Sequence, residues 1–261
     1  MPKFVLFIAL VCISVGSRAQ TWELGGSLGG AGYMGDLNPN NPVKISGLAI
    51  GGFVKRNFNG YLSAKLNLNL GKISGADSTS GDAQFRQRNL SFNTSLQEVS
   101  LTGEFNFMHY IPEAGKNKFT PYIFFGVAAA NYYPYVNYNG HSYSLRGERT
   151  EGQKKNYATT AFSFPYGVGV KYNILGKFTL GADIGYRNPN TDYLDDVSGL
   201  YPNKAGMSGL AKALSDRSGD KTGVYIGSAG TQRGDLNPRD TYFFAQFTLS
   251  YTFVTQKCYF Q

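Results

Sequence analysis

Charged residues are scarce in this sequence. Asp, Glu, Lys and Arg make up only 16% of its 261 residues, whereas an ordinary soluble domain carries roughly 25%. So low a fraction of charged residues argues against a soluble α/β enzyme, whose helices would be rich in Glu and Lys. Aromatic residues reach 15%, which excludes a disordered chain. The mean hydropathy of −0.27 argues against a bundle of membrane helices. An all-β protein remains.

The chain begins with an apolar run, residues 4–15, that is too short for a transmembrane helix of about 20 residues. A lysine precedes this run, and Ser17-Arg18-Ala19 follows it. Small residues after a short apolar segment are typical of a secretory signal peptide. We therefore predict a signal peptide over residues 1–19, with cleavage between Ala19 and Gln20.

Beyond the predicted signal peptide, apolar and polar residues alternate with a period of two. Every second residue from Leu62 to Leu70 is apolar, for example, and polar residues separate them. This pattern predicts β-strands with one apolar face. Each expected strand is about nine to thirteen residues long, enough for a tilted strand to cross a bilayer. The eight expected strands are residues 21–33, 45–57, 61–72, 98–107, 121–133, 162–172, 178–186 and 243–253.

The links between these strands alternate between short and long. A soluble sandwich, the alternative fold, gives no reason for every long loop to lie at one end, but an outer-membrane barrel does. We therefore predict an all-β, eight-stranded antiparallel transmembrane β-barrel over residues 20–253, with short periplasmic turns and long extracellular loops. Both termini, including a tail over residues 254–261, would lie in the periplasm. The short links are residues 57–60, 111–120 and 173–177, and the long ones are 34–44, 74–95, 134–161 and 187–240.

The polar face of the expected strands carries charges that an apolar core could not hold without partners. We predict that they form a polar network in the lumen. Because eight strands enclose an interior that side chains fill, an open porin is disfavoured. The apolar face would contact outer-membrane lipid. The lumen residues are Lys65, Glu98, Glu104, Lys171 and Asp183.

One pentapeptide, Gly-Asp-Leu-Asn-Pro, occurs after the first strand and again before the last. In a closed barrel these strands are neighbours, so we expect both copies at the external rim of the seam. Asp and Asn before Pro favour tight turns. The two copies are either a pair of rim turns or, more specifically, a recognition surface or a clamp on barrel closure. Their key residues are Asp36, Asn38, Pro39, Asp235, Asn237 and Pro238.

Neither histidine indicates catalysis. His109 follows the fourth strand and reads as an interfacial residue, and His141 lies beside Ser142 in a loop rich in Gly, Asn and Tyr. Asp192, Asp195 and Asp196 lack the full pattern of a calcium loop and are interpreted as turn-forming or helix-capping residues. We predict no catalytic residue, metal or cofactor. No basic stripe indicates nucleic acid.

Four motifs, in this order on an eight-stranded barrel, resemble the PorG-like outer-membrane proteins of Bacteroidetes. The resemblance implies a part in type IX protein secretion, which in gliding species supports motility, beside a periplasmic ring of a PorK-like lipoprotein and a PorN-like protein. The motifs are Gly35-Asp36-Leu37-Asn38-Pro39, Arg88-Asn89-Leu90-Ser91-Phe92, Glu104-Phe105-Asn106-Phe107 and Thr191-Asp192-Tyr193-Leu194-Asp195-Asp196-Val197-Ser198.

Cleavage of the signal peptide would remove Cys12 and leave Cys258 as the single cysteine of the mature chain. It would form an interchain disulfide or contact with a periplasmic ring component, or else stay an unpaired thiol without a role. The leading hypothesis is a structural anchor of the secretion machinery. A stand-alone surface-binding barrel acting through its external loops is the alternative, followed by a lipid-modifying enzyme.

Overall fold

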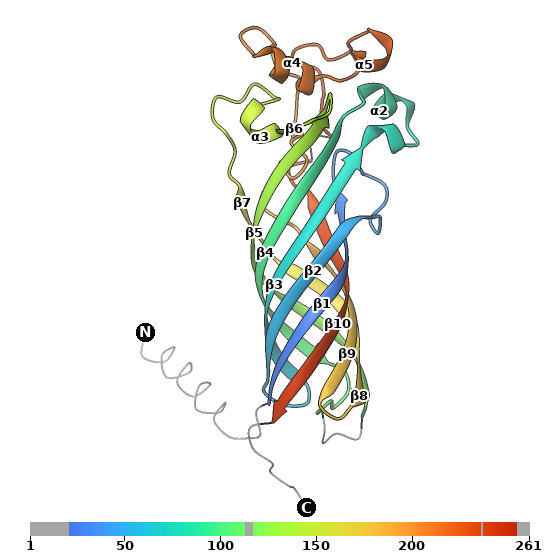
Figure 1. Cartoon of the computed structure of the whole chain (residues 1–261), viewed down its shortest axis with the longest axis vertical. Helices are drawn as coiled ribbons and strands as arrows, with labels where there is room; N and C mark the ends of the chain where they lie inside the picture. Colours follow the sequence, from blue (N-terminus) through green and yellow to red (C-terminus); the bar gives the residue numbers. More distant parts are fainter. Residues whose placement is uncertain (1–20, 113–116, 236, 255–261) are drawn as a thin grey trace, which may run out of the picture.

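The computed structural model describes residues 21–112, 117–235 and 237–254. The predicted signal peptide, its cleavage site at Ala19 and Gln20, and Cys258 lie outside these residues. Strands dominate the described chain (Figure 1). They are β1 (Thr21–Met34), β2 (Ile45–Asn57), β3 (Leu62–Ala76), β4 (Ser91–Asn106), β5 (Phe119–Tyr138), β6 (His141–Ser144), β7 (Thr160–Ser163), β8 (Pro165–Leu175), β9 (Phe178–Arg187) and β10 (Thr241–Val254).

The strands close into an antiparallel barrel. From β1 to β5 and from β8 to β10 each strand pairs with its neighbour in the chain, and β8 pairs with β5. The first and last strands pair with each other from Thr21–Val254 to Met34–Thr241. β7 and β8 both pair with β5 in one continuous register, so they form a single wall strand that is interrupted at Phe164. Pro165 follows the break and has no backbone N–H to donate. The wall therefore has eight strands, which confirms the predicted barrel.

The predicted boundaries are wrong at the end of the barrel that carries the long loops. β3 continues to Ala76, β4 starts at Ser91, and β5 extends over 20 residues to Tyr138 and turns back through β6. The segments expected to be loops over 74–95 and 134–161 are thus partly strand. Their hydrogen-bonded ladders continue above the apolar stretch, where period-two hydrophobicity ends and the sequence signal is lost. At the other end, β10 includes Val254, which was assigned to the tail.

All helices of the described residues lie in the long loops (Figure 1). Loops 35–44, 77–90, 139–159 and 188–240 fold together over one end of the barrel, and we call them the cap. Ser208 caps α4 by accepting a hydrogen bond from Ala211 N at 3.0 Å. None of the described helices is long and apolar enough to cross a membrane. The helices are η1 (Asp77–Thr79), α2 (Ala83–Arg88), α3 (Leu145–Glu148), α4 (Gly209–Ser215) and α5 (Gly219–Thr222).

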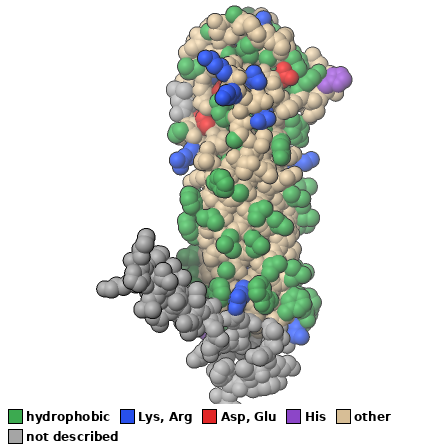
Figure 2. Space-filling model, turned by 90° about the vertical axis from the view of Figure 1, so that its left-hand side faces the viewer, with side chains coloured by type: hydrophobic (Ala, Val, Ile, Leu, Met, Phe, Trp, Pro, Cys, Tyr) green, Lys and Arg blue, Asp and Glu red, His purple; other side chains and the backbone are tan. Residues whose placement is uncertain are grey.

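The outer wall of the barrel is apolar, and the interior is polar. In β3, Leu66 and Leu68 are exposed, whereas Lys65 and Asn67, which alternate with them, are buried. Leu48 and Phe247 elsewhere on the wall are 78% and 70% exposed. Hydrophobic side chains lie along the wall, and charged ones lie near its two ends (Figure 2). Such an inverted pattern belongs to a transmembrane barrel of the outer-membrane type, not to a soluble sandwich.

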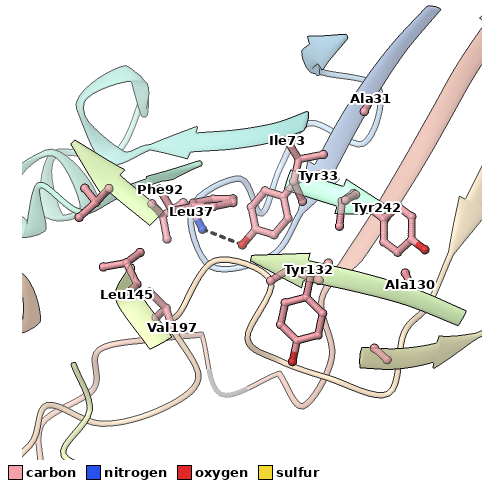
Figure 3. Packing of buried hydrophobic residues seen from close by; sticks show 14 of the residues in the cluster. Ala31, Tyr33, Leu37, Ile73, Phe92, Ala130, Tyr132, Leu145, Val197 and Tyr242 are labelled. Atoms are coloured by element: carbon pink, nitrogen blue, oxygen red, sulfur yellow. Dashed lines mark hydrogen bonds between the residues drawn. The ribbon is translucent and has the colours of Figure 1, made fainter. Parts of the chain in front are cut away.

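The cap holds a hydrophobic core of its own above the membrane wall. Tyr33 and Phe92 pack edge to face, with ring centroids 4.8 Å apart. The Leu37 N–H donates to the Tyr33 hydroxyl at 3.4 Å (Figure 3). Side chains from all four long loops and the upper strands join this cluster. The cap is therefore a packed unit and not a set of independent loops.

Candidate functional site

Eight charged side chains lie inside the barrel and form what we call the lumen network. They come from β1, β2, β3, β4, β8 and β9, whose alternate residues face inward. Four are cations and four are carboxylates, so the charges balance, as burial demands. The cations are Lys55, Lys65, Lys171 and Arg187, and the carboxylates are Glu23, Glu98, Glu104 and Asp183.

Glu104 is the centre of the lumen network. Lys171 Nζ lies 2.5 Å from its Oε2 atom. The Nζ atoms of Lys55 and Lys65 each lie 3.8 Å from the same carboxylate, and the Ser63 hydroxyl donates to it at 3.2 Å. One carboxylate thus faces three lysines from three different strands, and it ties opposite sides of the wall together.

The remaining carboxylates are also paired. Arg187 donates two hydrogen bonds to the Glu98 carboxylate, at 2.9 and 3.1 Å. The Tyr242 hydroxyl also donates to Glu98, at 2.7 Å. Lys55 Nζ lies 2.8 Å from Glu23. Two parallel N–H···O bonds to one carboxylate give both strength and a fixed geometry, so these pairs hold the interior side chains in place.

The lumen network fills the barrel. Between its side chains lies a cavity of about 20 Å³, which has room for about one water molecule. Asp183 lines this cavity, accepts a hydrogen bond from the Tyr122 hydroxyl at 2.9 Å, and lies 4.0 Å from Lys65 Nζ. The described interior is thus packed with side chains and is no open channel.

The structure brings together all five residues predicted for the lumen, and it adds Glu23, Lys55 and Arg187, which the sequence analysis missed. The alternation of inward and outward side chains along a strand could have identified two of these three residues. Arg187 is four residues from Asp183 and therefore faces the same side. Glu23 alternates with the exposed Trp22 and Leu24. The many glycines of β1 and β2 hid this alternation.

Two buried arginines join the loops of the cap. Arg88, at the end of α2, pairs with Asp77 at 2.7 Å. Its other N–H groups donate to the backbone carbonyls of Asp36, at 2.9 Å, and of Arg233, at 2.6 Å. Arg88 therefore links three of the four loops. The resemblance implied no role for Arg88, although this residue begins one of its motifs.

Arg233 connects the fourth loop. Its guanidinium lies 2.9 Å from Glu151, and it donates to the backbone carbonyls of Ser215 at 3.1 Å and Asp196 at 2.8 Å. The Glu151 carboxylate in turn accepts the Ser198 N–H at 2.9 Å. Both arginines are buried and paired, and breaking a buried ion pair is strongly destabilising. The stability of the cap therefore depends on these few polar contacts.

The structure places the two Gly-Asp-Leu-Asn-Pro copies side by side at the rim of the β1–β10 seam. The Asp36 carboxylate accepts the backbone N–H of Asp235. Asn38 closes the first turn by donating to Tyr33 O at 2.6 Å, and Asp235 accepts the N–H of Asn237 at 2.7 Å in the second. Pro39 and Pro238 are exposed. Leu236 lies outside the described residues.

Three buried carboxylates meet beneath this rim. Oxygens of Asp36, Asp195 and Asp240 lie within 4.8 Å of one another. Burial raises the pKa of Asp36 to about 7, and burial together with the neighbouring carboxylates raises the pKa of Asp195 and Asp240. Carboxylates are the donors a hard cation takes, but acidic groups this close occur without an ion, and we assign none.

The other acidic residues of this loop form turns and polar contacts. Asp195 accepts the N–H of Val197 at 2.8 Å, as a turn-forming aspartate does. Asp196 accepts the Tyr157 hydroxyl at 2.6 Å, and burial raises its pKa to about 6. Burial likewise raises the pKa of Asp192 to about 7.

The histidines lie apart from these networks. His141 and Ser142 are consecutive residues of β6 and are both exposed. Consecutive strand residues point to opposite faces, so this pair lacks the geometry of a base and its nucleophile. His109 is exposed at the short-turn end, where its ring lies edge-on to Tyr61 at 5.2 Å.

Comparisons with known proteins bear on the family and the fold. The model of the family described as "Domain of unknown function (DUF6089)" matches residues 2–213. No curated protein matches the sequence.

Three of the similar solved structures are outer-membrane proteins. The N-terminal barrel domain of Pseudomonas aeruginosa OprF is 14% identical, with a TM-score of 0.38, over 90% of this chain and all of that one. Neisserial surface protein A is 10% identical, with a TM-score of 0.40, over 90% and 97%. A major outer membrane protein of Thermus thermophilus is 14% identical, with a TM-score of 0.38, over 90% and 100%. At such identities the likeness concerns the fold alone.

Proposed function

The chain belongs to the DUF6089 family, and we propose that it is an outer-membrane structural component of the type IX protein secretion machinery. In this role the barrel anchors a periplasmic ring, built of a PorK-like lipoprotein and a PorN-like protein, to the outer membrane. In a gliding species the same assembly supports motility.

The filled lumen is the observation that carries this proposal. A channel needs a continuous path, but the lumen network leaves a cavity of about 20 Å³, and the cap covers one end of the barrel. What remains for function are the surfaces at the two ends and the lipid face. A barrel with a filled lumen suits the work of an anchor.

The positions of the resemblance motifs support the assignment to the secretion machinery. Asp36, Arg88 and Asp195 come from three separate motifs and meet in the cap. Glu104, from the fourth motif, is the centre of the lumen network. Residues of all four motifs therefore lie where the closed barrel and its cap are held together, which supports reading the motifs as one set.

The partner would meet the barrel at the short-turn end, which we place in the periplasm. Thr21 and Val254 pair at this end, so the segments before and after the barrel both leave from here. Cys258 follows Val254 by four residues, within reach of a partner at the membrane surface. We propose that it forms an interchain disulfide with a ring component.

Truncation after Val254 tests the anchor. It keeps the whole of β10 and its pairing with β1, so the barrel should still assemble. Full-length and truncated chains are pulled down from outer membranes, and co-purifying proteins are identified by mass spectrometry. We expect the full-length chain to retain ring components and the truncated chain to lose them.

Cys258→Ser is the matched control for the disulfide itself. It should abolish a reducible high-mass adduct on non-reducing gels while the rest of the tail is intact. Equal recovery of every partner by the full-length and truncated chains would contradict the anchor and favour a surface-binding barrel, which does not need the tail.

A further inference from the structure

The outer wall of the barrel has a groove of about 470 Å³ near the short-turn end. The groove crosses the lower parts of β3, β4 and β5 (Figure 1). Its volume falls within the roughly 300–1,000 Å³ of small-molecule sites. Its outward-facing lining is apolar and consists of Leu62, Ala64, Gly103, Phe105, Ile123 and Phe125, together with Phe58 of the turn between β2 and β3.

Two small residues form the floor of the groove. Ala64 and Gly103 are paired across β3 and β4, and Gly103 is in turn paired with Phe125 of β5. On β4 the outward-facing neighbours of Gly103 are Leu101 and Phe105, and both side chains are exposed. The wall is therefore hollowed between large apolar side chains, at a depth where the rest of the wall is filled by them.

The described residues leave the space above Gly103 open. The nearest atom that a Cβ built at Gly103 would meet is Phe125 O, at 3.8 Å, which is an ordinary van der Waals distance. At Gly126 of β5, by contrast, a Cβ would collide with the Leu101 carbonyl. Close packing of the strands thus requires glycine at Gly126 but not at Gly103, so the groove has room for a group from outside the described chain.

The groove rises from the rim of the barrel into the apolar wall. Ala64 is two residues from the start of β3, Gly103 three from the end of β4, and Phe125 six from the start of β5. Because a strand rises about 3.3 Å per residue, the end at Phe125 lies deeper in the wall. At the shallow end, Tyr61 is 43% exposed and its ring stacks on Phe105. Exposed tyrosines at the end of a barrel wall lie at the headgroup level, so the groove begins where acyl chains begin.

A cation lies beside the shallow end of the groove. Arg56 of β2 is paired with Ala64 of β3, and its guanidinium lies 5.4 Å from the Trp22 ring centroid and 5.7 Å from that of Phe58. Aromatic rings at such distances attract a guanidinium. The group carries five N–H donors, whose geometry matches the oxygens of a phosphate. A lipid phosphate can therefore be added to the contacts that Arg56 makes within the chain.

We propose that this groove binds one glycerophospholipid, with an acyl chain on Ala64 and Gly103 and the phosphate at Arg56. An apolar groove that begins beside a cation at the headgroup level matches the two parts of such a lipid. The choice of lipid rests on the proposed orientation, because phospholipid forms the periplasmic leaflet of an outer membrane and lipopolysaccharide forms the other. It does not depend on the ring components of the proposed anchor.

The test uses the full-length chain, purified from outer membranes in a mild detergent. Native mass spectrometry counts the lipids that stay bound, and analysis of the extracted lipid identifies them. The delipidated chain is then titrated with dipalmitoyl phosphatidylethanolamine and with dipalmitoylglycerol, which has the same acyl chains and no phosphate. We expect one retained phospholipid per chain, and tighter binding of phosphatidylethanolamine than of dipalmitoylglycerol.

Gly103→Leu separates the groove from general contact with lipid. Its side chain fills open space, so thermal unfolding of the barrel should be unchanged, whereas the retained phospholipid should be lost. Gly52→Leu is the matched control, because Gly52 also faces outward with open space, at 3.8 Å from Gly25 O, but lies outside the lining. It should retain the lipid. Arg56→Gln should weaken binding of phosphatidylethanolamine roughly 10-fold and leave that of dipalmitoylglycerol unchanged.

Three results would overturn the proposal. One is that Gly103→Leu retains phospholipid as well as the wild type does, and another is that the retained lipid is lipopolysaccharide. The third is a wild-type dimer without lipid that Gly103→Leu separates into monomers, which would make the groove an interface between two copies. None of these results concerns the ring components, whose binding the truncation after Val254 tests by itself.

Discussion

At the scale of single residues, buried charges do most to hold this molecule together. Arg88 is the clearest case, because its guanidinium forms an ion pair with one carboxylate and donates hydrogen bonds to two backbone carbonyls that are distant in the sequence. Its sequence separation from Arg233 is 145 positions, and such a contact exists only after the barrel has closed. No local pattern could therefore predict it, although the motif around Arg88 was recognised as part of a resemblance.

Replacement of Arg88 by alanine should loosen the cap. It leaves Asp77 buried and unpaired and frees the carbonyls of Asp36 and Arg233, so we expect a loss of about 3–5 kcal/mol, the usual cost of breaking a buried pair. Urea unfolding in lipid vesicles measures it. Arg86→Ala is the control on the same helix, because Arg86 is exposed, and it should change stability by less than about 0.5 kcal/mol.

The raised carboxyl pKa values predict how the cap responds to pH. Asp36 and Asp192 titrate near 7 in the folded chain, against an ordinary value of 3.8. Burial is the main cause for both. For Asp36, the hydrogen bond from the Asp235 backbone N–H and the charge of Arg88 favour the ionised form, whereas the Asp235 carboxylate opposes it. For Asp192, the Asp235 carboxylate opposes ionisation. Between pH 4 and 7 the folded state therefore holds protons that the unfolded state has lost, and stability falls as pH rises.

Hydrogen exchange of the 188–240 loop measures this effect. Protection should be greatest near pH 4, after correction for intrinsic exchange, and should decline up to about pH 7. Asp36→Asn should make the profile less steep, because the amide does not titrate while Asp192 still does. A profile that is flat in the wild type, or one that rises with pH, would contradict the assignment of these carboxyls.

At the scale of elements, the strands were predictable and the loops were not. Period two and the alternation of short and long links yielded the eight-stranded wall, because every wall strand has lipid on one side and the lumen on the other. The upper parts of β3, β4 and β5 face the cap and not lipid, so their pattern differs and their ends were misplaced. In β1 and β2, the many glycines weaken the alternation, so Glu23 was overlooked and Lys55 could not be recognised.

The two faces of β4 should respond in opposite ways to substitution. Glu104→Gln leaves Lys55, Lys65 and Lys171 in the lumen with no full negative charge at their centre, so we expect a loss of about 3 kcal/mol or more. Phe105, the next residue, faces outward and is 42% exposed. Phe105→Leu keeps an apolar side chain toward lipid and should cost less than about 1 kcal/mol.

Folding into vesicles, followed by urea titration, compares the two β4 variants directly. If Glu104→Gln unfolds at the same urea concentration as the wild type, the lumen network is dispensable and the account of the interior is wrong. A second variant, Lys171→Met, should restore part of the stability when combined with Glu104→Gln, because it removes one of the unpaired cations.

At the scale of the whole molecule, the barrel is closed along its interior and capped at one end, and the first and last described residues, Thr21 and Val254, lie at the other. The two ends and the wall of the barrel therefore differ in what they can contact. The apolar wall holds the chain in the membrane, the cap presents a folded surface, and the short-turn end is where we propose that a partner binds. Composition alone indicated an all-β chain, and the structure accounts for its few charges, eight of which balance one another in the lumen.

Export by cells that lack this chain tests the central claim most directly. In the organism that makes the chain, its gene is deleted and then restored as the wild type or as the truncation after Val254, and type IX cargo is quantified in the medium and in the periplasm. The account predicts that cargo accumulates in the periplasm of the deletion strain, that the wild type restores export, and that the truncated chain reaches the outer membrane without restoring it. Normal export from the deletion strain would contradict the proposed function.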